Sequence, residues 1–164
     1  MTVPEHAFPV RRGPRPRTTL TNPHTQLDQQ PDDPALRELL LAELALLPGV
    51  VWRPSAISVP GAEALWLADD AGGGPPEAFM IGREFAHLHP VPDRSLHVMV
   101  PQPLAEQLIA DGWGELHPVA RMGLLPRTAI MVYAPRDDLE VAVVARIVGA
   151  SHAFASGQTP ASAS

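Results

Sequence analysis

Four histidines lie close together in the sequence and form the clearest candidate for a chemical site. The spacing is His87-x-His89, followed by His97 and then, after a segment predicted to be helical, by His117. The unperturbed pKa of histidine is about 6.5, so near neutral pH its imidazole serves as an acid–base group or as a metal ligand. We therefore expect any functional site to lie in this part of the chain.

The histidines become neighbours if they lie on the two strands of a β-hairpin. Side chains alternate along a strand, so His87 and His89 point to the same face. If residues 90–94 form the loop, His87 pairs directly with His97, and directly opposed residues have Cβ atoms about 4.5–5.5 Å apart. Three histidines are then predicted on one face. A shift of one residue in register would separate them.

Glu84 and Asp93 are the nearest carboxylates in the sequence. Each is a candidate to orient an imidazole by accepting a hydrogen bond from one of its ring nitrogens. Strict alternation along the strand places Phe85 on the face of the histidines and Glu84 on the opposite face. An ion pair between Glu84 and a nearby arginine is an alternative. Trp113 lies between two glycines, where it forms either a pocket wall or a packing anchor.

Three interpretations of the histidine cluster stay open. His87, His89 and His97 can ligate a divalent metal such as zinc, iron, copper or manganese, with His117 or a water completing the shell. In a metal-free site, one neutral imidazole removes a substrate proton and another holds the resulting oxyanion. In the third interpretation the histidines only pack against their neighbours or lie at the surface.

Further candidates lie where a predicted strand gives way to a helix, in the sequence Tyr133-Ala-Pro-Arg136. The planar fork of Arg136 can grip a carboxylate or an enolate, but it can equally pair with a local acid. The sequence contains no Gly-x-Ser-x-Gly elbow, no HExxH zinc motif and no Gly-x-Gly-x-x-Gly loop.

Composition narrows the function classes. The 164 residues, 45% hydrophobic and 18% charged, are typical of one soluble globular domain. A net charge of −6 argues against nucleic-acid binding. All 12 basic residues are arginines, which excludes Schiff-base catalysis and a Walker-type phosphate loop. The absence of cysteine excludes disulfides and thiolate sites. We expect a cytoplasmic protein that acts on a small-molecule substrate and has no membrane partner. The sequence leaves open whether the chain forms a homo-oligomer.

The pattern of elements predicts a single α+β domain over residues 11–156, with a mainly antiparallel sheet and helices packed on one face. Residues 1–10 and 157–164 are expected to be disordered ends. The proline-rich arm, residues 11–34, is predicted from its composition alone to be a solvated extension. Helices are predicted at 34–47, 103–110 and 137–154, and strands at 50–53, 56–59, 64–68, 78–89, 95–100 and 128–133.

Several separated motifs resemble the fungal luciferase domain family, and we expect a soluble member of the bacterial type. The resemblance covers residues 11–154 and implies that the arm packs on the domain. The motifs are Arg83-Glu84-x-Ala86-His87-x-His89 with Asp93 and Leu96-His97, Gly112-Trp113-Gly114-x-x-His117-Pro118, Tyr133-Ala134-Pro135-Arg136, Gly13-x-Arg15-Pro16 and Thr25-Gln26-Leu27.

The fungal enzymes oxidise a hydroxylated α-pyrone, 3-hydroxyhispidin, with molecular oxygen and no known organic cofactor. The resemblance thus implies a cofactor-independent oxygenase, or related acid–base chemistry on an enolisable lactone or ketone. We expect His87 or His97 to be the base, with the other histidines and Arg136 holding the anion. The alternatives are a metal-dependent enzyme using His87, His89 and His97, and a non-catalytic protein that binds a small ligand. The implied pocket residues are His87, His89, His97, His117, Tyr133 and Arg136.

Overall fold

The computed structural model describes residues 8–158 and is built on a six-stranded antiparallel sheet of order β1-β2-β3-β4-β6-β5. The edge strand β1 ends in a proline, which has no N–H to donate and is tolerated at an edge. The strands are β1 (Val50–Pro54), β2 (Glu63–Leu67), β3 (Glu84–Leu88), β4 (Leu96–Met99), β5 (Gly114–Leu116) and β6 (Ala129–Val132).

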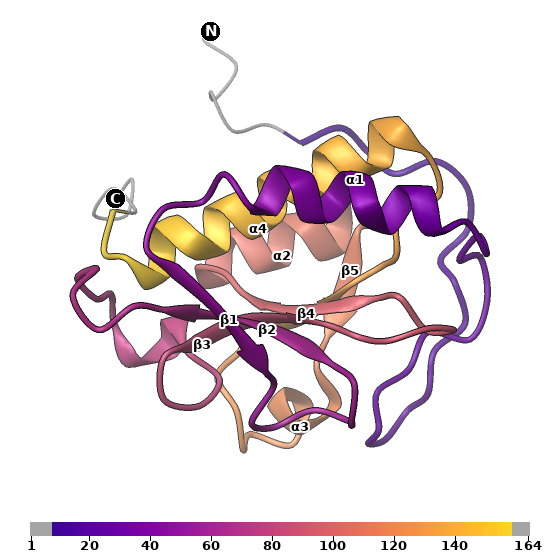
Figure 1. The fold of residues 1–164 in the computed structure, drawn as a ribbon. Coiled ribbons are helices and arrows are strands. Elements are labelled where there is room, and N and C mark those ends of the chain that lie inside the picture. Colours follow the sequence, from indigo (N-terminus) through magenta and orange to yellow (C-terminus); the bar gives the residue numbers. More distant parts are fainter. Residues whose placement is uncertain (1–7, 159–164) are drawn as a thin grey trace, which may run out of the picture.

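Three helices cover one face of the sheet: α1 (Pro34–Leu44), α2 (Gln102–Ala110) and α4 (Asp138–Ala155) (Figure 1). Helix α4 packs on β3 and β4, and α1 packs on α4. The leucines and valines between the helices and the sheet form the core. The short helices α3 (Pro118–Arg121) and η1 (Pro76–Ala78) lie outside this layer. The predicted α+β domain, with an antiparallel sheet and helices on one face, is confirmed.

The long helices begin where the sequence predicts. The Asp33 side chain accepts a hydrogen bond from the N–H of Ala35 at the start of α1, and Asp137 accepts one from the N–H of Glu140 at the start of α4. Such caps satisfy N–H groups that have no partner inside the helix.

Two predictions about the strands are wrong, and one strand of the sheet is missing from the predicted set. The predicted strand at 56–59 does not form: residues 56–58 are bends, and the N–H of Ala56 bonds to Glu84 at the start of β3. The strand predicted at 78–89 begins only at Glu84, after η1 and a turn. Strand β5 was not predicted, because Gly114 in its first position is a weak strand former. Glycine is required there, since a Cβ atom would clash with the carbonyl oxygen of Met131 on β6.

The arm packs along the domain and then reaches the sheet face that the long helices leave open (Figure 1). Arg11, His24 and Gln26 of the arm are buried. The Gln26 side chain accepts a hydrogen bond from the N–H of Ala134, and Nη1 of Arg15 donates to the carbonyl of Gly114. The arm is thus tied to the strands that flank the histidines.

The predicted disordered ends lie mostly outside the described residues. Residues 1–7 and 159–164 are not described. Of the remainder, the carbonyl of Pro9 accepts a hydrogen bond from Nε1 of Trp113. Within residues 8–158, no helix combines the length and the apolar character that a membrane crossing requires.

Candidate functional site

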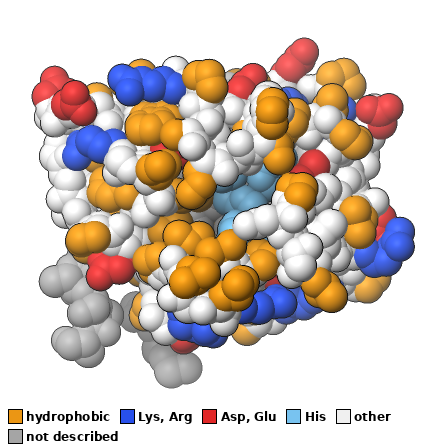
Figure 2. All heavy atoms as spheres, turned by 90° about the horizontal axis from the view of Figure 1, so that it is seen from below, with side chains coloured by type: hydrophobic (Ala, Val, Ile, Leu, Met, Phe, Trp, Pro, Cys, Tyr) orange, Lys and Arg blue, Asp and Glu red, His pale blue; other side chains and the backbone are white. Residues whose placement is uncertain are grey.

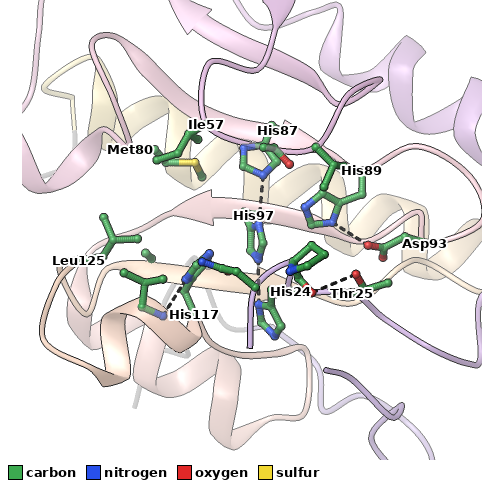
Figure 3. Close-up of a pocket in the computed structure, with 16 residues that line it drawn as sticks. His24, Thr25, Ile57, Met80, His87, His89, Asp93, His97, His117 and Leu125 are labelled. Atoms are coloured by element: carbon green, nitrogen blue, oxygen red, sulfur yellow. Dashed lines mark hydrogen bonds and ion pairs between the residues drawn. The ribbon is translucent and has the colours of Figure 1, made fainter. Parts of the chain in front are cut away.

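The β3–β4 hairpin brings the predicted histidines together. His87 pairs with His97 in the ladder, and the N–H of His89 donates to the carbonyl of Ser95 across the hairpin. The ring centroids of His87 and His97 lie 5.1 Å apart, and those of His89 and His97 lie 4.6 Å apart. The predicted register of the hairpin is therefore confirmed, and the three rings share one face of the sheet (Figure 3).

The predicted orientation of Glu84 and Phe85 is wrong, because β3 contains a bulge. Leu65 pairs with Ala86 but Trp66 pairs with Glu84, so Phe85 is an extra residue in β3. The bulge turns Phe85 into the helix-covered core and brings Glu84 to the histidine face.

Glu84 is fully buried and accepts three hydrogen bonds. They come from Nδ1 of His87 at 2.8 Å, the hydroxyl of Ser55 at 2.8 Å and the N–H of Ala56 at 2.9 Å. Ser55 and Ala56, at the start of the segment predicted to be a strand, therefore hold the Glu84 side chain in place.

His89 is oriented by a second carboxylate. Its Nδ1 lies 3.2 Å from Oδ2 of Asp93 and 2.9 Å from Oγ of Ser95, and that hydroxyl donates to Oδ1 of Asp93 at 2.5 Å. Burial raises the pKa of Asp93, but the hydrogen bonds from His89 and Ser95 lower it more, and the net shift is downward. Because an ionised carboxylate only accepts, Nδ1 of His89 carries a proton, and in the neutral ring the lone pair therefore lies on Nε2. Among the described residues, no hydrogen bond engages Nε2 of His89.

His117 is held in the opposite tautomer. It precedes α3, and its Nδ1 accepts a hydrogen bond from the N–H of Val119 at 3.1 Å. A neutral ring that accepts at Nδ1 has its proton on Nε2. Burial, together with the charges of His24, His87 and His89, lowers the pKa of His117 to about 4. His117 is therefore a neutral imidazole at neutral pH, with a free N–H donor at Nε2.

The arm contributes a fifth histidine that the sequence analysis did not include in the site. His24 is buried, its Nδ1 lies 2.9 Å from Nε2 of His97, and its Nε2 lies 3.0 Å from Oε2 of Glu115. Nothing in the local pattern links His24 to a residue so distant in the sequence. The available signal was its position next to the motif Thr25-Gln26-Leu27, one of those that carry the resemblance.

Tyr133, Arg136 and Trp113 lie outside the cavity described below. The Tyr133 hydroxyl donates to Oε1 of Glu115, and burial raises the pKa of Tyr133 to about 12. Arg136 forms an ion pair with Glu140, four residues later on α4. Trp113 packs in the core. The structure thus brings His87, His89, His97 and His117 together, and it places these three residues elsewhere.

A cavity of about 570 Å³ opens above the histidines on the sheet face away from the long helices. Figure 2 shows histidine side chains at the bottom of a hollow surrounded by hydrophobic side chains. No arginine lies among the described residues that form its wall. The wall comprises Asn22–Thr25 of the arm, Ile57–Val59, Met80, His87, His89, Asp93, His97, His117, Val119, Leu125 and Ala129.

Two sets of three histidines bring their ring nitrogens close enough together to share one metal ion. The ligating atoms of His87, His89 and His97 lie within 4.8 Å of one another, as do those of His24, His97 and His117. Both sets share His97, whose two ring nitrogens are hydrogen bonded to His87 and His24. A metal bound by either set would have to replace one of these two hydrogen bonds.

Comparison with known proteins gives consistent matches. A family model described as the Luciferase domain matches residues 82–151. The chain is 34% identical over 161 residues to a luciferase of Armillaria ostoyae, with 88% of this chain and 59% of that protein covered. A luciferase of Neonothopanus nambi is 38% identical over 71 residues, which is 42% of this chain and 27% of that protein. A search of the solved structures gave no match.

These relatives are fungal, so they give no support to the expectation of a bacterial-type member. The chain spans about 59% of the length of the Armillaria relative it matches. The Luciferase domain match contains His87, His89, His97 and His117, which form one side of the cavity. The chain is thus similar to the Luciferase domain family over residues 82–151 and to the fungal luciferases over most of its length.

Proposed function

We propose that the chain is a luciferase-like enzyme that catalyses cofactor-independent oxygenation of an enolisable small molecule, such as a hydroxylated lactone or a ketone. The observation that carries this proposal is the opposite hydrogen-bond partners at Nδ1 of His89 and His117, an accepting carboxylate and a donating backbone N–H, on one cavity. The neutral His89 ring presents a lone pair at Nε2, and the Asp93 carboxylate accepts from its Nδ1. The His117 ring instead presents an N–H at Nε2. A base and an oxyanion donor are the two groups that enolisation requires.

His89 is a better base than His87 or His97, the two bases that the sequence predicts. Both ring nitrogens of His87 are hydrogen bonded, to Glu84 and His97. Both ring nitrogens of His97 are likewise engaged, with His87 and His24. Only a nitrogen with a free lone pair can accept a substrate proton, which supports His89 in this role.

The proposed reaction balances with O2 as the only co-reactant. His89 removes the acidic proton of the substrate, and the N–H of His117 holds the enolate oxygen. The enolate carbon donates its electron pair to O2, so that a C–O bond forms and O2 is reduced to a peroxide. The terminal peroxide oxygen then takes back the proton from His89, which leaves a substrate hydroperoxide and the enzyme in its starting state.

Oxygen consumption tests the proposal. The purified chain of 164 residues, treated with a chelator and analysed for metal, is mixed with a panel of hydroxypyrones and 1,3-diketones in an oxygen electrode. We expect uptake with at least one member, a loss of about 10²–10⁴-fold in the His89→Ala variant, and partial rescue by added imidazole. His152→Gln, a buried histidine whose Nε2 contacts the carbonyl of Pro48, is the matched control.

The alternatives predict other results. Stoichiometric metal that survives purification, with activity lost on chelation and restored by the metal, would replace this proposal by a metal-dependent reaction. A panel member that binds without any oxygen uptake or proton exchange would favour the non-catalytic binding protein.

A further inference from the structure

Three imidazole rings of the β3–β4 hairpin lie beside one another in the wall of the cavity (Figure 3). One ring nitrogen from each of His87, His89 and His97 lies within 4.8 Å of the other two. Nε2 of His87 and Nδ1 of His97 lie 3.1 Å apart. Two nitrogens bound to one tetrahedral zinc ion, each at about 2.0–2.1 Å, are about 3.3 Å apart. A zinc ion can therefore replace the hydrogen bond between His87 and His97 with little change in the distance between the two rings.

The opposite nitrogens of two of these rings already face a carboxyl group. A histidine that ligates a metal through one ring nitrogen carries its proton on the other, and in most metal sites this N–H donates to a carboxylate or a carbonyl. Nδ1 of His87 lies 2.8 Å from Oε2 of Glu84. Nδ1 of His89 lies 3.2 Å from Oδ2 of Asp93, and its Nε2 has no hydrogen-bond partner among the described residues. Both rings are thus held in the orientation that a metal ligand needs.

The third ring, His97, is supported through a second imidazole. Nε2 of His97 lies 2.9 Å from Nδ1 of His24, and Nε2 of His24 lies 3.0 Å from Oε2 of Glu115. His24 can therefore accept the N–H of a metal-bound His97 and donate its own N–H to Glu115. A buried divalent cation also requires negative charge nearby, and a cation in turn favours the ionised form of a carboxyl group. Glu115 adds to that charge.

The other set of close histidines, His24, His97 and His117, lacks such support. The N–H of Val119 donates to Nδ1 of His117 at 3.1 Å, so this nitrogen is already occupied as an acceptor. If Nε2 of His117 bound a metal, the ring proton would move to Nδ1, and two N–H donors would face each other. The hydrogen bonds thus favour the set on the hairpin.

We propose that His87, His89 and His97 form a binding site for one zinc ion, and that zinc in this site switches off the proposed reaction. Imidazole suits zinc, and three protein ligands leave a fourth position that a water from the cavity can take. The ion uses the lone pair at Nε2 of His89, the nitrogen to which the proposed function assigns proton removal. The inhibition therefore rests on the proposed function, whereas the zinc site rests on its own geometry.

Equilibrium dialysis against zinc alone tests the site without any substrate. The chain of 164 residues is first freed of metal with a chelator. We expect one tightly bound zinc ion per chain, and X-ray absorption at the zinc edge is expected to show three imidazole ligands. Thiolates cannot contribute, because the sequence contains no cysteine. A chain that binds no zinc at micromolar concentrations, or binds it with fewer than three imidazoles, would overturn the proposal.

His89→Gln and His117→Gln are a matched pair, because both rings line the same cavity but belong to different sets. We expect His89→Gln to weaken zinc binding by more than about 100-fold, which exceeds the effect of losing an outer partner of a ligand. His117→Gln is expected to leave zinc binding unchanged. Circular dichroism checks that both variants fold. The opposite pattern would assign the ion to the other set and overturn the proposal.

Asp93→Asn tests the site with all three ligands kept. The change removes the negative charge next to Nδ1 of His89, and we expect zinc affinity to fall by about 10–100-fold. Asp32→Asn, at an exposed carboxylate, is the control and is expected to keep the affinity of the unchanged chain. Equal affinities in the two variants would show that Asp93 does not support a zinc ligand, which contradicts the proposed arrangement.

Oxygen uptake with and without bound zinc tests the inhibition. With a substrate from the panel, we expect one equivalent of zinc to abolish uptake and a chelator to restore it. Unchanged uptake by the zinc-loaded chain would overturn the inhibitory role, and uptake that requires zinc would overturn it together with the metal-free reaction. If neither form consumes oxygen, the proposed function fails, and dialysis still decides whether the zinc site exists.

Discussion

Nδ1 of His24 lies 2.9 Å from Nε2 of His97, although 73 positions separate the two residues in the sequence. His24 belongs to the arm, and His97 belongs to a central strand of the sheet. The pocket is therefore complete only when the arm is docked. Its chemistry depends on a segment outside the part of the chain that the Luciferase domain model matches.

The Asp93→Asn variant tests the orientation of His89. The carboxylate accepts from Nδ1 of His89, so it fixes the tautomer and stabilises the imidazolium that forms during proton transfer. We expect kcat for oxygen uptake to fall within the range of about 10²–10⁴-fold that general base catalysis contributes, with KM little changed. Asp32→Asn, which alters an exposed carboxylate paired with Arg94, serves as the control. Equal kcat values in the two variants would contradict a base at His89.

The buried carboxylate of Glu84 is expected to be important for stability. Replacement by alanine leaves the Ser55 hydroxyl, the Ala56 N–H and Nδ1 of His87 without an acceptor. We expect Glu84→Ala to lower the free energy of unfolding by about 3 kcal/mol or more, and Glu84→Gln to lower it less. Denaturant unfolding measures both, with the exposed Glu38→Ala as the reference. A loss below about 1 kcal/mol for Glu84→Ala would show that the site relaxes around the deletion.

Acid is expected to destabilise the fold in the pH range set by His117. Its pKa is lowered from 6.5 to about 4 in the folded chain, so between these values the unfolded chain binds the proton and the folded chain does not. The stability contribution is present above pH 6.5 and is lost as the pH falls towards 4. We expect His117→Gln to reduce the slope of the free energy of unfolding against pH. The reduction is less than about 1.4 kcal/mol per pH unit, because the ring is partly exposed. Unfolding curves from pH 4 to 7.5 measure the slope. An unchanged slope would argue that the ring is solvated.

The sequence predicted the elements whose signals are local. Asp33 and Asp137 mark the starts of α1 and α4 because a capping side chain acts within one helical turn. The pairing of His87 with His97 followed from the length of one loop, since the loop fixes the hairpin register.

The remainder depends on contacts between distant segments. The bulge at Phe85 lies where β3 pairs with β2, and residues 55 and 56 bond to Glu84 rather than pairing as a strand. The partnership of His24 with Glu115 requires the arm to fold across β5. These contacts join residues at no regular spacing in the sequence. Neither the two-residue alternation of a strand nor the spacing of a helix therefore predicts them.

The extra residue in β3 also constrains anyone who wishes to redesign this protein. Regular pairing of β3 with β2, with Phe85 kept and brought into the ladder, is a change that a designer of ideal sheets would regard as an improvement. The same change would turn the side chain of Glu84 towards the leucines and valines and leave His87 facing no acid. The one extra residue thus brings an acid and an imidazole, three positions apart, to the same face of one strand.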